Sequence, residues 1–143
     1  MGSLNCLKTE KDSMDELDPP AAYAFLQAHP EALLIDCRTE IEYLYVGHPV
    51  GAEHIAWQEA PDWAVDPDFV RKVLFRAEQD LSRPVLLICR SGRRSAHAAI
   101  CLHDAGFMQV INIREGFEGE LDGLDHRGTL GGWRFHGLPW QQS

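Results

Sequence analysis

Short apolar runs alternate along the chain with segments of helical periodicity. The tightest apolar run is Val85-Leu86-Leu87-Ile88-Cys89, a comparable run covers residues 32–35, and residues 110–113 are expected to form a further strand. Each has the length of a strand and lacks polar alternation, which is typical of a parallel sheet buried on both faces. A further short strand is predicted near residues 52–55.

Helix signals fall between these runs. Asp18 precedes Pro19-Pro20, and an aspartate cap followed by proline in the first turn is a strong helix start. Thr39 is placed to cap a short helix, and Gly106 to end a long one. Helices are therefore predicted at about residues 18–29, 40–45, 66–81 and 95–105.

Alternating strands and helices predict an α/β fold with a parallel sheet flanked by helices on both faces. The glycine-rich segment 114–143 has weak periodicity and is predicted to be an ordered loop. The domain organisation expected is a polar, mobile tail at 1–17 and a single domain at 18–143.

Composition limits the classes of function. The chain has 143 residues, 45% hydrophobic and 24% charged, which fits one globular domain. No apolar run approaches the ~20 residues that span a bilayer, and the polar N-terminus shows no secretory signal, so a cytoplasmic protein is expected. A net charge of −9 argues against nucleic-acid and membrane partners.

Positive charge gathers in one place despite the acidic balance. Three of the 13 Lys and Arg residues are Arg90, Arg93 and Arg94, with no acid between them. Such a cluster favours a small anionic ligand. The four cysteines form no C-x-x-C pair and no zinc-finger spacing, so no metal site is expected.

Cys89 follows the apolar strand directly, at the sheet edge where α/β proteins bind ligands. The loop after it is short enough for successive N–H groups to surround the sulfur, and Gly92 permits the turn that this requires. The following helix adds the free N–H groups of its first turn. Amides and arginines together favour the thiolate, which is the reactive form. The sequence thus predicts a nucleophilic cysteine.

Two enzyme classes use a cysteine in an anion-binding loop. Cysteine phosphatases have Cys-x5-Arg, in which the arginine clamps a tetrahedral phosphate. Here Ser95 occupies that position, and Arg94 comes one residue earlier. The shorter spacing gives a tighter cradle, suited to one sulfur atom bound to the cysteine. Sulfur transfer is therefore favoured over phosphatase or arsenate reductase chemistry.

The motifs resemble those of single-domain rhodaneses. The resemblance rests on the loop Cys89–Ser95, the strand Leu34–Arg38 and Gly47–Ala52, the last with its proline displaced by one position. The glycine and tryptophan pattern of 116–140 is similar to the C-terminal part of a bacterial subgroup. The family implies a parallel sheet of about five strands, no cofactor, and thiosulfate or a persulfide as sulfur donor.

The resemblance also implies roles for the loop. Cys89 would carry sulfur as a persulfide, Arg90 and Arg94 would bind the sulfonate of a donor such as thiosulfate, and Arg93 would face solvent. Ser91, Gly92 and Ser95 complete the expected substrate site.

Asp36 and Arg38 are expected to support the site from the neighbouring strand end, by pairing or by holding a loop. Cys37 is expected to be a core residue, and a redox role for it stays open. The alternative function is a persulfide relay or regulatory module whose acceptor is a protein thiol.

Overall fold

A computed structural model describes residues 15–143, and its centre is a five-stranded sheet. Neighbouring strands pair in parallel in the order β1-β6-β5-β2-β4. The strands are β1 (Asp15–Leu17), β2 (Leu33–Asp36), β4 (Glu53–His54), β5 (Val85–Ile88) and β6 (Val110–Ile113). The predicted α/β architecture with a parallel sheet is confirmed.

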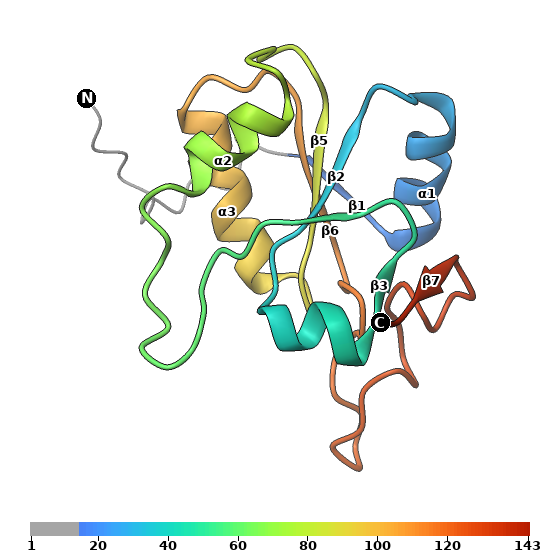
Figure 1. Ribbon diagram of the computed structural model, residues 1–143. Coiled ribbons are helices and arrows are strands. Elements are labelled where there is room, and N and C mark those ends of the chain that lie inside the picture. Colours follow the sequence, from blue (N-terminus) through green and yellow to red (C-terminus); the bar gives the residue numbers. More distant parts are fainter. Residues whose placement is uncertain (1–14) are drawn as a thin grey trace.

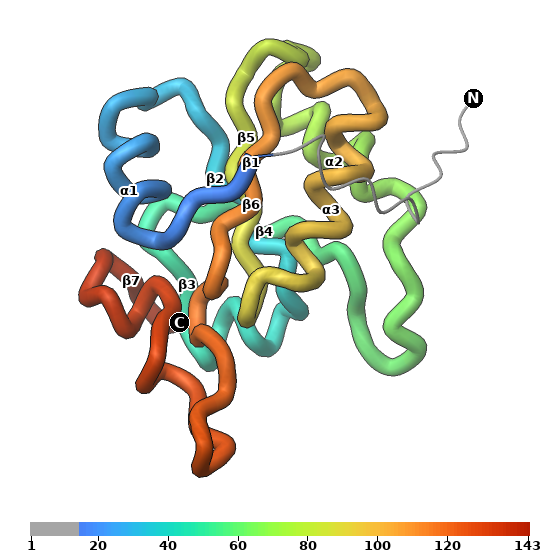
Figure 2. The backbone as a smooth tube through the Cα atoms, turned by 180° about the vertical axis from the view of Figure 1, so that it is seen from behind, coloured from blue at the N-terminus to red at the C-terminus, as the bar shows by residue number. Residues whose placement is uncertain are grey.

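Three helices cover the two faces of the sheet. α1 (Pro19–Ala28) lies on one face, and α2 (Phe69–Arg76) and α3 (Arg93–Asp104) lie on the other (Figure 1). The predicted cap of α1 is present, because the Asp18 carboxylate accepts a hydrogen bond of 2.9 Å from Ala21 N. The reverse view in Figure 2 shows the same three layers.

Two apolar clusters fill the spaces between the layers. Successive side chains of a strand point to opposite faces. In β5, Val85 and Leu87 accordingly pack with α2 and α3, whereas Leu86 and Ile88 pack in the cluster that includes Ala22 of α1. Both faces of the sheet are therefore buried, which explains why β5 is apolar at every position and why β2 and β6 each contain a single polar residue, Asp36 and Asn112.

Shorter elements surround the carboxyl ends of the strands. A π-helical turn, η2 (Glu42–Val46), follows β2, and Thr39 caps this helical segment by accepting a hydrogen bond of 3.3 Å from Glu42 N. β3 (His48–Pro49) pairs antiparallel with β7 (Trp140–Gln141). The C-terminal segment, expected to be loop throughout, thus also supplies a strand that fastens the chain end to the body.

Several boundaries differ from those predicted, among them the start of α2, which is Phe69 and not Asp66. Residues 15–17, expected in the tail, form edge strand β1 because their backbone pairs with β6; the rest of that tail lies outside the described residues. α2 ends at Arg76, since Glu78 and Gln79 adopt positive φ, so Leu81 lies beyond it. α3 begins at Arg93 rather than Ser95.

None of the helices within residues 15–143 combines the length and the apolar character that crossing a membrane requires.

Candidate active site around Cys89

Cys89 lies directly after β5, at the base of a pocket of about 400 Å³. Its side chain is almost fully buried, with 1% of the residue exposed. The sequence-predicted residues that line this pocket with it are Arg90, Ser91, Arg93 and Arg94. A reactant can therefore reach the sulfur only by entering the pocket.

Three donors point at the sulfur from within the loop and the start of α3. Cys89 Sγ lies 3.1 Å from Gly92 N, 3.3 Å from Ser95 N and 3.2 Å from Ser95 Oγ. Gly92 has φ +103°, a conformation that a residue with a Cβ rarely adopts. All three groups are hydrogen-bond donors, an arrangement that can stabilise negative charge developing on the sulfur during a reaction.

The carbonyl groups of the loop face away from the sulfur because other segments hold them. Cys89 O accepts from Phe117 N at 2.8 Å, and Arg90 O accepts from Glu118 N at 2.9 Å. The first-turn N–H groups of α3 have no carbonyl of a preceding helical turn to pair with, as at other helix N-termini, and that of Ser95 points at Cys89 Sγ.

Gly116 makes this arrangement possible. A Cβ built at Gly116 would lie 2.5 Å from the Arg90 carbonyl and 2.5 Å from Cys89 O. Any other residue would push the turn at 116–119 off the loop, and the carbonyl groups would lose their donors. The Gly116-Phe117 motif, only supportive evidence in the sequence, is thus part of the construction of the site.

Asn112 is a site residue that sequence reasoning missed. It is buried in β6; its Oδ1 accepts a short hydrogen bond from Ser95 Oγ and its Nδ2 donates to Gly92 O at 3.2 Å. Nδ2 also lies 3.1 Å from Glu16 Oε2 of β1. Asn112 therefore holds both loop residues that contact the sulfur. The sequence feature that could have revealed it is a single amide side chain within an otherwise apolar strand.

Arg94 has a partner that the sequence did not indicate. Its two Nη atoms lie 2.9 Å from the two carboxylate oxygens of Glu42 on η2. Burial opposes ionisation of Glu42, but the hydrogen bonds and charge of Arg94, with bonds from Thr39, outweigh it and lower its pKa to about 2. Arg94 was expected to bind a sulfonate, and its guanidinium already forms an ion pair with Glu42.

The other predicted residues occupy different environments. Arg93 faces solvent, with 82% of its side chain exposed. Arg38 and Asp36 are fully buried and joined by Nε–Oδ1 and Nη2–Oδ2 contacts of 2.9 and 2.6 Å. Arg38 also donates to Gly47 O at 2.5 Å and lies over the Phe117 ring, 4.6 Å from its centroid. This pair holds the loops together and does not line the Cys89 pocket.

Cys37 packs in the core beside the site. Its thiol donates to Ile88 O at 3.4 Å. Burial, followed by the proximity of Cys89 and Asp36, raises the pKa of Cys37 well above its usual value. A protonated, buried thiol is a poor nucleophile.

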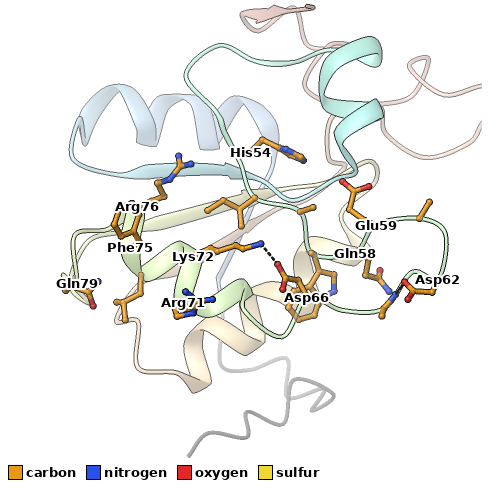
Figure 3. Close-up of a pocket in the computed structure, with 16 residues that line it drawn as sticks. His54, Gln58, Glu59, Asp62, Asp66, Arg71, Lys72, Phe75, Arg76 and Gln79 are labelled. Carbon is orange, nitrogen blue, oxygen red and sulfur yellow. Dashed lines mark hydrogen bonds and ion pairs between the residues drawn. The ribbon is translucent and has the colours of Figure 1, made fainter.

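A second, larger cavity of about 820 Å³ lies between α2 and the segment 54–66. Each lysine and arginine that lines it pairs with a carboxylate, as the Lys72–Asp66 contact of 2.6 Å shows (Figure 3). Arg76 pairs with Glu53, and Arg71 with Asp68. The cavity lining contains no cysteine. None of its lining residues corresponds to Cys89 and the hydrogen-bond donors around its sulfur in the smaller pocket.

The fold and this pocket define an α/β protein with a cysteine surrounded by hydrogen-bond donors at the carboxyl end of its sheet. The model of the rhodanese-like domain matches residues 19–120, and the chain belongs to that family.

Individual relatives support this assignment. The chain is similar to the crystal structure of Rv0390 from M. tuberculosis, with 35% identity, a TM-score of 0.79, and coverage of 90% of this chain and 98% of that one. An uncharacterised protein of Rickettsia conorii is 30% identical over 90% of this chain and 98% of its own length. The thiosulfate sulfurtransferase GlpE of Haemophilus influenzae is 28% identical over 75% and 88%, respectively.

Proposed function

We propose that the protein is a sulfurtransferase that moves sulfane sulfur from thiosulfate or a persulfide to a thiophilic acceptor, through a persulfide on Cys89. The observation that most directly supports this proposal is the convergence of three hydrogen-bond donors, Gly92 N, Ser95 N and Ser95 Oγ, on the sulfur of Cys89. This sulfur lies at an arginine-lined pocket. The likeness to a thiosulfate sulfurtransferase supports the same chemistry.

In the first half-reaction the Cys89 thiolate attacks the outer sulfur of thiosulfate. A new S–S bond forms on Cys89, and the S–S bond of thiosulfate breaks with its electron pair leaving on sulfite. Sulfite is a stable anion, so no general acid is required. The arginines of the pocket, Arg90 above all, offset the charge of the donor and of the departing sulfite.

In the second half-reaction an acceptor thiolate attacks the outer sulfur of the persulfide. The bond between the two sulfurs on Cys89 breaks, and its electron pair returns to Sγ. Ser95 has one hydroxyl proton, which it can donate either to the sulfur or to Asn112 Oδ1. Turning that proton to Sγ stabilises the regenerated thiolate. The cycle consists of two covalent transfers and predicts ping-pong kinetics.

Mass spectrometry of the protein after incubation with thiosulfate tests this proposal. One sulfur atom is expected on Cys89, and the adduct should disappear when cyanide is added and thiocyanate is formed. The variant Cys89→Ser should lose both the adduct and the thiocyanate.

Cys37→Ser is the matched control, because Cys37 is buried nearby but donates its thiol hydrogen to Ile88 O. It should retain the adduct. An unmodified wild-type protein after exposure to thiosulfate and to persulfide donors would contradict the proposal.

A further inference from the structure

The loop at residues 119–131 adds a wall to the Cys89 pocket. Most of it lies beyond residue 120, where the match to the family model ends. Glu120, Leu121 and Arg127 line the pocket together with Cys89. The loop projects from the body of the molecule beyond the carboxyl ends of the strands (Figure 2). Of these three residues, Leu121 and Arg127 lie outside the matched range.

Hydrogen bonds hold the loop in one conformation. The Asp122 carboxylate accepts from Leu124 N at 2.8 Å and His126 N at 2.9 Å. Gly128 N donates to Glu118 O at 2.8 Å, which closes the base of the loop. Arg127 Nη1 donates to Gly119 O at 2.7 Å. The Arg127 guanidinium is thus positioned before any ligand binds, and its remaining N–H groups are available.

The four arginines of the pocket differ in how their charge is compensated. Arg94 is paired with Glu42, and Arg93 lies 3.7 Å from Glu120. Within residues 15–143, neither Arg90 nor Arg127 forms an ion pair with a carboxylate. The pocket consequently has two positive charges available to a ligand, one from the loop after Cys89 and one from the added wall.

The pocket is also larger than thiosulfate needs. Thiosulfate has five non-hydrogen atoms, and at the ~30 Å³ that one water molecule occupies in the liquid it would fill about 150 Å³. The cavity measures about 400 Å³. Leu121 and Arg127, an apolar and a cationic side chain, line the same cavity. An organic molecule with a carboxylate matches this combination.

We propose that Arg127 forms an anion subsite that selects, as sulfur acceptor, a low-molecular-weight thiol bearing a carboxylate. This inference rests on the proposed function. The acceptor thiolate attacks the outer sulfur of the Cys89 persulfide, forming an organic persulfide and returning the electron pair to Cys89 Sγ. Burial of Cys89 favours a small acceptor, because only a molecule that enters the pocket reaches the sulfur. The acceptor carboxylate binds the Arg127 guanidinium.

The test compares two acceptors that differ only in this charge. N-Acetylcysteine carries a carboxylate, and its amide carries an uncharged group of the same size. The protein is first loaded with thiosulfate, and kcat/KM for sulfur transfer to each thiol is measured. The ratio of acid to amide is then compared between wild type and Arg127→Gln, so that the intrinsic reactivities of the two thiols cancel. The expected result is about a tenfold fall in the ratio.

Two further variants complete the design. Arg127→Lys keeps the charge and should retain part of the preference. Arg71→Gln removes the same charge from an exposed site on α2 and should leave the ratio unchanged. An Arg127→Gln protein that still forms the Cys89 adduct but keeps the wild-type ratio, or slows both acceptors equally, would overturn the subsite while leaving the sulfurtransferase proposal intact. Failure of wild type to form the adduct would instead remove the function on which the subsite rests.

Discussion

The two cavities of this protein differ in a way that size does not reveal. In the larger, about 820 Å³, each lysine and arginine of the lining pairs with a carboxylate, as Lys72 does with Asp66. The smaller, about 400 Å³, contains Cys89 under three hydrogen-bond donors and two arginines without carboxylate partners in the described chain. A charged group that is already paired attracts a ligand only weakly. Hydrogen-bond donors held around one sulfur atom, in contrast, can stabilise charge that develops on it.

Removing a hydrogen-bond donor from Cys89 Sγ should have the largest effect on the rate of persulfide formation. Ser95→Ala deletes the hydroxyl that lies 3.2 Å from Cys89 Sγ. Loss of one preorganised donor to a developing charge costs about 10²-fold, so persulfide formation from thiosulfate should slow by about that factor. Stopped-flow measurement of the first half-reaction checks this. Ser82→Ala, in an exposed turn, is the control, and a loss below threefold would show that the hydroxyl is not used.

Asn112 should matter less, because it acts through Ser95 and Gly92 without touching the sulfur. Asn112→Leu keeps a similar volume but leaves Gly92 O and the Ser95 hydroxyl without their partner. We expect about a tenfold slower persulfide formation and a loss of about 1–3 kcal/mol in the free energy of unfolding.

Asn112→Asp separates the two contacts of this residue. It keeps an acceptor for Ser95 but cannot donate to Gly92 O, and it places a carboxylate beside Glu16. It should therefore lose stability without regaining the wild-type rate. A variant that loses stability while persulfide forms at the normal rate would restrict Asn112 to folding.

The Glu42–Arg94 pair should make the free energy of unfolding depend on pH. The folded pKa of Glu42, about 2, lies below its ordinary value of 4.5. The pair therefore stabilises the fold above about pH 4.5, and this contribution is lost as the pH falls towards 2. Glu42→Gln should cost about 1–3 kcal/mol at pH 6, since both side chains are only partly buried.

Urea unfolding of wild type and Glu42→Gln at pH 6 and pH 3 checks this sign. The difference between the two proteins should shrink at pH 3. A difference that is constant or grows on acidification would contradict the lowered pKa of Glu42.

A substitution in the larger cavity should have the smallest effect on sulfur transfer and on stability. Lys72→Gln breaks its ion pair with Asp66 at an exposed position. The rate of persulfide formation should not change, and the free energy of unfolding should change by no more than about 0.5 kcal/mol. A clear loss of sulfur transfer in this variant would mean that the two cavities are functionally connected.

Local sequence was sufficient for the elements whose signals are local. Apolar runs predicted β2, β5 and β6, and the Asp18 cap with its prolines predicted the start of α1. The position of Cys89 between a buried strand and a helix predicted an anion-binding loop, and the structure shows amides at its sulfur. These features depend on neighbours in the chain, which is why pattern and propensity reveal them.

Contacts between distant segments were decided only by the tertiary structure. Gly116 and Phe117 turn the carbonyl groups of the Cys89 loop outward, Asn112 joins Ser95 to Gly92, and Glu42 engages Arg94. Strand β1 was hidden in a polar segment, because its pairing with β6 uses backbone groups that carry no sequence signature. Arg127 enters the pocket through a loop whose course depends on long-range packing. The sequence by itself predicted the sheet and the position of Cys89 at its edge; the partners that orient and surround that cysteine come together only in the folded chain.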